Sequence, residues 1–132
     1  MYSVGVKQDF SAIHALVGDV DPEEKVPHPH EYTMEWRFRV KSLDHMGFSL
    51  DIAMLELTLG SLLRSIQDFS LNELPYFAEL QTSLENLCRF FFDRLSTSLR
   101  EQLRGDDISR IDSMHLRIWE NENAWAGIEG NI

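Results

Sequence analysis

The 132-residue chain has little cysteine and little positive charge, and each shortage argues against a class of protein. Its one cysteine, Cys88, has no partner for an internal disulfide, which fits a reducing compartment. Twelve Lys and Arg against 22 Asp and Glu give a net charge of −10. This balance argues against nucleic acid or an anionic membrane as a partner, because both require a basic surface. The N-terminus has no basic leader followed by an apolar run, so we expect a cytoplasmic protein without a secretory signal.

The chain also lacks a long uninterrupted apolar run. The most apolar stretch, from Phe48 to Leu63, is broken by Asp51 and Glu56, which is typical of an amphipathic helix and not of a membrane span. No internal repeat is visible. A hydrophobic content of 43% over this length predicts a single globular domain spanning residues 1–132.

The clearest pattern is an alternation of polar and apolar residues from Glu31 to Lys41, which predicts a half-buried strand. Its apolar members are Tyr32, Met34, Trp36, Phe38 and Val40. A less regular alternation predicts another strand over residues 2–14, bent or bulged near Lys7 to Asp9. The acidic, proline-bearing stretch from residue 18 to residue 29 indicates a loop between the two strands.

Helical spacing of apolar residues predicts two helices after these strands. The first covers residues 52–66, with Ser49 or Asp51 as its N-cap. Thr82 followed by Glu85 is a capping-box pattern that opens the second helix, and Gly105 to Asp107 would end it.

Two short strands complete the chain, one around residues 114–118 and one over residues 124–128. The order strand, strand, helix, helix, strand, strand predicts an α+β fold. We expect two layers, a four-stranded antiparallel sheet with both helices on one face. The uncovered face and the sheet edges would then favour a symmetric homo-oligomer.

Three histidines are candidate metal ligands. His28 and His30 are two residues apart, so on extended backbone both imidazoles point the same way. His14 ends the first strand and would join them if the two strands pair as a hairpin. Three neutral imidazoles with an open fourth position make a catalytic zinc site. Alternatively, these are loop histidines on a turn that Pro29 stiffens.

Two further places could bind a small molecule. Glu120 follows the apolar series of the third strand, where a carboxylate needs a partner such as the paired N–H groups of an amidine-like edge. It could instead turn out to solvent at the strand end. Ser83 and Glu85 open the second helix, where they serve as a cap, although free N–H groups there can also bind acceptor atoms of a ligand.

Six short segments, taken in order, resemble motifs of the 6-pyruvoyl-tetrahydropterin synthase and 6-carboxy-tetrahydropterin synthase family. They are Phe10-Ser-Ala-Ile-His14, His28-Pro-His30, Gly47-Phe-Ser-Leu-Asp51-Ile, Ile66-Gln-Asp-Phe-Ser-Leu-Asn72, Thr82-Ser-Leu-Glu85-Asn-Leu and Trp119-Glu120-Asn121. The resemblance implies the tunnelling fold, in which trimers close a twelve-stranded barrel and two trimers stack into a homohexamer. It also implies a pterin pocket between subunits.

The resemblance further implies roles for the candidate residues. A zinc ion would be held by His14, His28 and His30. Glu120 would anchor the pterin ring, with Ser83, the backbone of Leu84 and Glu85 nearby.

The chain departs from the family pattern where the chemistry is expected. Glu24 stands in the place of the family's cysteine, and the family's Asp-His pair falls on Gln67 and Asp68. These residues cannot reproduce a relay of thiolate, imidazole and carboxylate. We therefore expect a pterin-binding homologue without the standard synthase reaction. The alternatives are a zinc-dependent lyase acting on a dihydroneopterin-type substrate with Glu24 as general base, and an oligomeric scaffold without a ligand.

Overall fold

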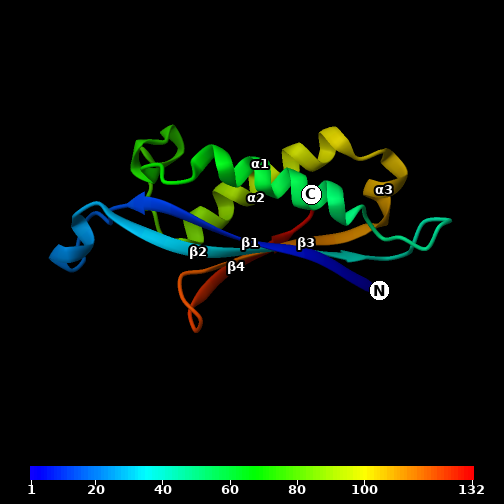
Figure 1. Ribbon diagram of the computed structural model, residues 1–132, viewed down its shortest axis with the longest axis horizontal. Helices are drawn as coiled ribbons and strands as arrows, with labels where there is room; N and C mark the ends of the chain where they lie inside the picture. Colours follow the sequence, from blue (N-terminus) through cyan, green and yellow to red (C-terminus); the bar gives the residue numbers. More distant parts are fainter.

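The computed structural model describes residues 1–132 and consists of two layers, a four-stranded sheet with helices packed on one face (Figure 1). The strands are β1 (Tyr2–His14), β2 (His28–Val40), β3 (Ile111–Trp119) and β4 (Trp125–Gly130). They lie in the order β1-β2-β3-β4, and every neighbouring pair is antiparallel. The predicted α+β architecture is therefore confirmed.

The first two strands form a long hairpin. Tyr2 pairs with Val40 at one end and His14 pairs with His28 at the other, without a break in register. The second strand begins at His28, three residues earlier than its predicted start at Glu31. The two leading histidines thus belong to the sheet and not to the preceding loop.

The bulge expected near Lys7 to Asp9 is wrong, because β1 pairs with β2 residue by residue through this stretch. The irregular alternation comes from Gln8, a polar residue in an inward position. It lies beside Gly60, where an added Cβ would be 3.4 Å from the Gln8 Oε1 atom. The register shift of this sheet falls instead between Arg39 and Val40, where β2 pairs with β3.

Two long helices cover the sheet. In α1 (Ile52–Ile66), the Asp51 carboxylate accepts a hydrogen bond from the Met54 N–H group at 3.3 Å, so Asp51 is the N-cap. The cap of α2 (Leu84–Gln102) is Ser83, whose hydroxyl accepts from the Asn86 N–H group at 3.2 Å. Of the two residues that the sequence suggests for this cap, Ser83 is therefore confirmed and Thr82 is wrong.

The connections between these elements contain short helical segments. A 3-10 turn, η1 (Pro22–Lys25), lies between the hairpin strands, and η2 (Leu71–Glu73) and η3 (Pro75–Phe77) lie between the long helices. Helix α2 ends before Gly105, and α3 (Gly105–Arg110) follows as a separate short helix that was not expected.

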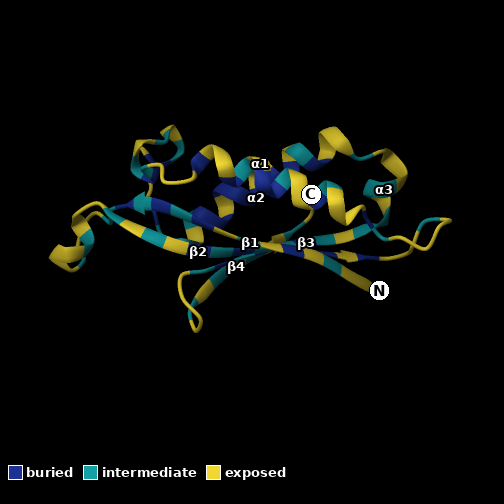
Figure 2. Ribbon diagram, in the orientation of Figure 1, coloured by how far each residue is buried: buried dark blue, intermediate teal, exposed yellow.

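The core fills the space between the helices and the inner face of the sheet (Figure 2). Along β2, the buried residues are those of the predicted apolar series, including Trp36 and Phe38, which are fully buried. The opposite face of the sheet bears charged residues. No helix covers this face (Figure 1). No helix of this chain combines the length and the apolar character needed to cross a membrane.

Candidate metal and ligand site

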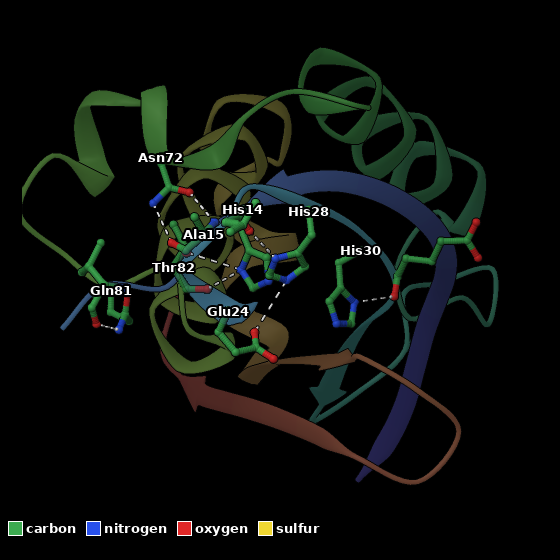
Figure 3. Close-up of polar contacts among 11 residues, drawn as sticks. His14, Ala15, Glu24, His28, His30, Asn72, Gln81 and Thr82 are labelled. Carbon is green, nitrogen blue, oxygen red and sulfur yellow. Dashed lines mark hydrogen bonds and ion pairs between the residues drawn. The ribbon is translucent and has the colours of Figure 1, made fainter. Parts of the chain in front are cut away.

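The closed end of the β1–β2 hairpin gathers three histidines (Figure 3). The ring centroid of His14 lies 4.6 Å from that of His28 and 5.5 Å from that of His30. The rings of His28 and His30 are 6.1 Å apart. Because the hairpin pairs His14 with His28 and places His30 two residues along the same face, the sheet itself brings the three imidazoles together.

Backbone carbonyls fix the orientation of two of these rings. The Nδ1 atom of His14 lies 3.1 Å from the Thr82 carbonyl oxygen, and that of His28 lies 2.8 Å from the Val26 carbonyl oxygen. Since a carbonyl oxygen only accepts, Nδ1 donates in both rings, and Nε2 carries the lone pair in the neutral form of each ring. The Nε2 atom of His14 is buried and has no partner in the protein.

Burial is also the main reason that the pKa of His14 lies below its ordinary value, with smaller contributions of the same sign from His28 and His30. The lowered pKa favours the neutral imidazole of His14, the form that binds a metal. A buried, unpartnered Nε2 lone pair beside two further imidazoles fits a zinc ion.

Glu24 joins this cluster from η1. Its carboxylate Oε2 atom lies 3.7 Å from His28 Nε2, and ligand atoms of His14, Glu24 and His28 all lie within 4.8 Å of one another. The Glu24 carbonyl oxygen accepts a hydrogen bond of 2.7 Å from the Leu16 N–H group, which ties η1 to the chain just after β1. A carboxylate is thus held where it can bind a metal or exchange a proton.

Two side-chain amides hold the segment that follows β1. Asn72 accepts from the Ala15 N–H group and donates to the Ala15 carbonyl oxygen, at 2.8 and 2.9 Å. Gln81 makes the same pair of bonds to Val17, both at 2.8 Å (Figure 3). Each amide acts as the partner that a neighbouring strand would provide. These amides therefore support the position of the histidine cluster, a role that the sequence did not indicate for Gln81.

His30 lies slightly apart from the compact group. Its Nδ1 atom is 3.4 Å from the Glu31 carbonyl oxygen, and its ring stacks on Tyr32 with centroids 4.9 Å apart and an angle of 19° (Figure 3 shows His30 beside the other two histidines). Tyr32 is only 3% exposed, and its hydroxyl has no hydrogen-bond partner in the protein. Burial raises the pKa of Tyr32, and the charge of Glu120 adds to this effect.

Next to Tyr32 lies a cavity of about 700 Å³. Glu120 lines it from the turn after β3, and Gln67 and Ser11 line it from the β1 edge. The Glu120 N–H group donates to the Ala124 carbonyl oxygen at 3.0 Å, which closes the β3–β4 turn. Since β3 ends at Trp119, the Glu120 side chain is exposed at this cavity and is not buried with the apolar series.

The other residues expected near a ligand lie elsewhere in the single chain. Ser83, Leu84 and Glu85 form the N-terminus of α2 and do not line the Glu120 cavity. Cys88 is buried in the same helix, and burial raises the pKa of its thiol to about 12, so it packs in the core as an unreactive side chain.

Gln67 and Asp68 are engaged with the edge of β1. Gln67 accepts from the Ser11 N–H group at 3.1 Å and donates to the Ser11 hydroxyl at 2.8 Å. The Ser11 hydroxyl in turn donates to the Asp68 carboxylate at 2.5 Å. These contacts fasten the 67–68 segment to the sheet, and neither side chain can supply an imidazole.

A family model described as 6-pyruvoyl tetrahydropterin synthase matches residues 3–131. No curated protein sequence matches the chain. Its structure is similar to that of the Caenorhabditis elegans 6-pyruvoyl tetrahydropterin synthase, with a TM-score of 0.76 and 19% identity, over 98% of this chain and 95% of that chain.

Two further comparisons involve the Plasmodium vivax 6-pyruvoyl tetrahydropterin synthase. The enzyme gives a TM-score of 0.81 with 13% identity, over 99% of this chain and 98% of that chain. A variant of the same enzyme, in which a catalytic glutamate is replaced by alanine, gives a TM-score of 0.77 with 14% identity over the same shares. At sequence identities of 13–19%, these structural similarities establish the fold of this chain.

Proposed function

Because the chain belongs to the 6-pyruvoyl tetrahydropterin synthase family, we propose that it binds a pterin in the Glu120 cavity without the standard synthase reaction. The observation that carries this proposal is the position of Glu120. Its carboxylate forms no ion pair within the chain, and it faces a cavity of a size suited to a small ligand. The N–C–N edge of a pterin offers two parallel N–H donors to such a carboxylate.

The same proposal includes a zinc ion beside the ligand. His14, His28 and His30 would hold it, through the Nε2 atoms that the backbone carbonyls leave free on the first two rings. When bound, zinc would act as a Lewis acid on an oxygen atom of the ligand. Glu24 is near enough to this group to add a fourth protein contact.

We also propose that the complete site requires a neighbouring subunit. Ser83, Leu84 and Glu85 do not line the Glu120 cavity of their own chain, so a second chain would have to bring them to the ligand. The free edges of β1 and β4 and the uncovered face of the sheet support assembly. A hexamer made of two trimers is the expected form, and light scattering coupled to size-exclusion chromatography would test it.

We infer the loss of the standard synthase reaction from the residues at positions 67 and 68 and from Glu24. Gln67 and Asp68 are both hydrogen-bonded to Ser11, so this segment presents no imidazole to shuttle protons. By the family resemblance, Glu24 would stand in the place of the thiol that the standard relay uses.

The direct test is fluorescence titration of the purified protein with neopterin. Binding is expected for the wild-type protein, and Glu120→Gln should weaken it about tenfold or more, since the charge-assisted bonds are lost. Glu122→Gln, a neutralisation at the same cavity two residues away, is the matched control. Absence of neopterin binding at millimolar concentration would exclude the proposal.

A second candidate function is a zinc-dependent lyase acting on a dihydroneopterin-type substrate. The distance of 3.7 Å from Glu24 Oε2 to His28 Nε2 favours it, and so does the catalytic glutamate named for the Plasmodium vivax enzyme. Glu24 would remove the proton of a side-chain hydroxyl. The adjacent carbon–carbon bond would then break to give a carbonyl, its electron pair passing into the pterin ring system, which takes up a proton.

Product analysis after incubation with 7,8-dihydroneopterin separates the two candidates. A lyase releases an aldehyde and a shortened pterin, and Glu24→Gln should abolish this release. A wild-type protein that binds the pterin and returns it intact would leave only the binding function.

A further inference from the structure

Three polar side chains are joined in a row on the face of the sheet that no helix covers. The Ser113 hydroxyl oxygen lies 2.8 Å from His115 Nε2, and the Glu129 Oε2 atom lies 3.0 Å from His115 Nδ1. A neutral imidazole protonated on Nδ1 satisfies both contacts, because it donates to Glu129 and accepts from Ser113. The serine thus lies beside a base that a carboxylate holds in the required tautomer, which is the arrangement of a serine, histidine and acid triad.

Regular strand geometry produces this row. Ser113 and His115 are two residues apart in β3, so their side chains leave the sheet on the same face. Glu129 of β4 is the direct cross-strand partner of His115. The pairing of β3 with β4 ends at Met114 and Gly130, so no residue of β4 lies opposite Ser113. The serine is therefore not covered by β4.

The surroundings of His115 suit a general base. Its side chain is only 17% exposed, and burial, followed by the charge of Arg37, lowers its pKa, although Glu129 acts in the opposite direction. The neutral ring that can take a proton is thereby favoured. The Ser113 hydroxyl has one other acceptor in reach, the Asp112 carboxylate, but at the longer distance of 3.4 Å. The contact with His115 is therefore the better hydrogen bond.

Two arginines lie where a reacting carbonyl group would need positive charge. Arg39 is the cross-strand partner of Ser113, and Arg37 is that of His115. Neither forms an ion pair within the chain, and the Nε atom of Arg37 is buried without a hydrogen-bond partner. A guanidinium group beside the serine can stabilise the negative charge that develops on the carbonyl oxygen during attack.

A cavity of about 300 Å³ adjoins the row and indicates the kind of substrate. Its ionisable lining consists of two arginines, one histidine and two glutamates: Arg37, Arg117, His115, Glu35 and Glu129. Glu129 is engaged with His115, which leaves two guanidinium groups against the one carboxylate of Glu35. With Arg39 next to Ser113, this balance favours a small substrate that carries a negative charge.

We propose that Ser113, His115 and Glu129 form a catalytic site that hydrolyses small carboxylic esters bearing a negative charge. Ser113 Oγ attacks the ester carbonyl carbon while His115 Nε2 takes the hydroxyl proton. The ester C–O bond then breaks, the leaving alcohol receives that proton, and the acyl group remains on Ser113. Water, which gives a proton to His115 as it attacks, releases the carboxylic acid, and Ser113 takes the proton back. The site shares no lining residue with the Glu120 cavity, so this inference does not depend on pterin binding.

The first test is labelling of the wild-type protein with a fluorophosphonate, with the site located by peptide mass spectrometry. The label should be found on Ser113. His115→Gln should slow the labelling by about 100-fold or more, since the general base is lost. Glu129→Gln should slow it as well, because an amide can donate to Nδ1 and favour the wrong tautomer.

The matched control is Ser3→Ala. Ser3 is exposed on the same face and is also a cross-strand partner of Arg39, but it forms no hydrogen bond with a histidine. This variant should be labelled at the wild-type rate. Label on residues other than Ser113, or a labelling rate that His115→Gln leaves unchanged, would overturn the inference.

The second test is release of 4-nitrophenol from its acetate ester and from its succinate monoester. The wild-type protein should have the higher kcat/KM for the negatively charged succinate ester, and Ser113→Ala should reduce both rates to that of buffer. A labelled wild-type protein that hydrolyses neither ester would also overturn the inference. Fluorescence titration of Ser113→Ala with neopterin should give wild-type affinity, so failure of either proposal leaves the other intact.

Discussion

His14 and His28 lie directly opposite each other across the β1–β2 hairpin, with ring centroids 4.6 Å apart, and each points Nδ1 at a backbone carbonyl. The carbonyls belong to Thr82 and Val26, one far along the chain and one close by. Both rings are therefore fixed in the tautomer that leaves Nε2 free for a metal.

Replacing one of these rings should remove zinc. His28→Ala is expected to lower the zinc content of protein loaded with zinc and then dialysed, from close to one ion per chain to a small fraction, since two imidazoles hold zinc far more weakly than three. Elemental analysis measures this directly. His45→Ala, at an exposed histidine of the turn after β2, should retain the zinc. Equal zinc content in both variants would contradict the site.

The amide of Asn72 should stabilise both the fold and the histidine cluster. Asn72→Ala removes two hydrogen bonds to Ala15 and should lower the free energy of unfolding by about 1–3 kcal/mol, measured in urea. The loss should be larger than that of Asn123→Ala, at an exposed position of the β3–β4 turn. If the variant is as stable as the wild-type protein, the contact contributes nothing.

The assignment of the α2 cap can be tested by substitution. Ser83→Ala should lower the free energy of unfolding by about 1 kcal/mol, because the Asn86 N–H group loses its acceptor. Ser83→Asp should retain most of the stability, since a carboxylate caps as well as a hydroxyl does. Both values come from thermal or urea unfolding. A Ser83→Ala protein with wild-type stability would mean that the cap lies elsewhere.

His115 should make the stability depend on pH. Burial, followed by the nearby charge of Arg37, holds its pKa below the ordinary value of 6.5, although Glu129 acts in the opposite direction. Below pH 6.5 the unfolded chain therefore binds a proton that the folded protein does not, and acid lowers the free energy of unfolding. The stability is recovered as the pH rises towards 6.5 and above.

The measurement is the urea midpoint at pH 5 and at pH 7. His115→Gln should reduce the difference between the two midpoints relative to the wild-type protein. His45→Gln, at an exposed histidine, should leave the difference unchanged. A difference that is the same in all three proteins would assign the pH dependence to other groups.

The alternation of side chains was enough to predict most of the fold. In β2 the period of two places Trp36 and Phe38 in the core, and the strand starts three residues before its predicted start because Pro29 favours a loop in the sequence. Gln8 is the reason for the wrong prediction of a bulge in β1. A polar residue in an inward position interrupts the alternation, whereas Gly60 on α1 leaves room for the Gln8 side chain. That space depends on tertiary packing and cannot be inferred from β1 alone.

The sequence predicted the histidines of the candidate site but not the residues that hold them in place. Parity alone suggested that His14 could meet His28 and His30, since strand geometry carries that information. The hydrogen bonds from Asn72 and Gln81 to the segment after β1 join residues more than fifty positions apart, and no local sequence pattern predicts them.

The unbroken pairing of the β1–β2 hairpin also limits how this protein can change over time. A one-residue insertion or deletion in either strand turns every later side chain to the other face of the sheet. Such a change would expose part of the core and move the histidines in the same event. The position of the histidine cluster and the composition of the core are therefore both retained as long as the strand lengths are retained. Substitution of individual side chains can alter the chemistry, but changes in strand length are removed by the loss of the fold.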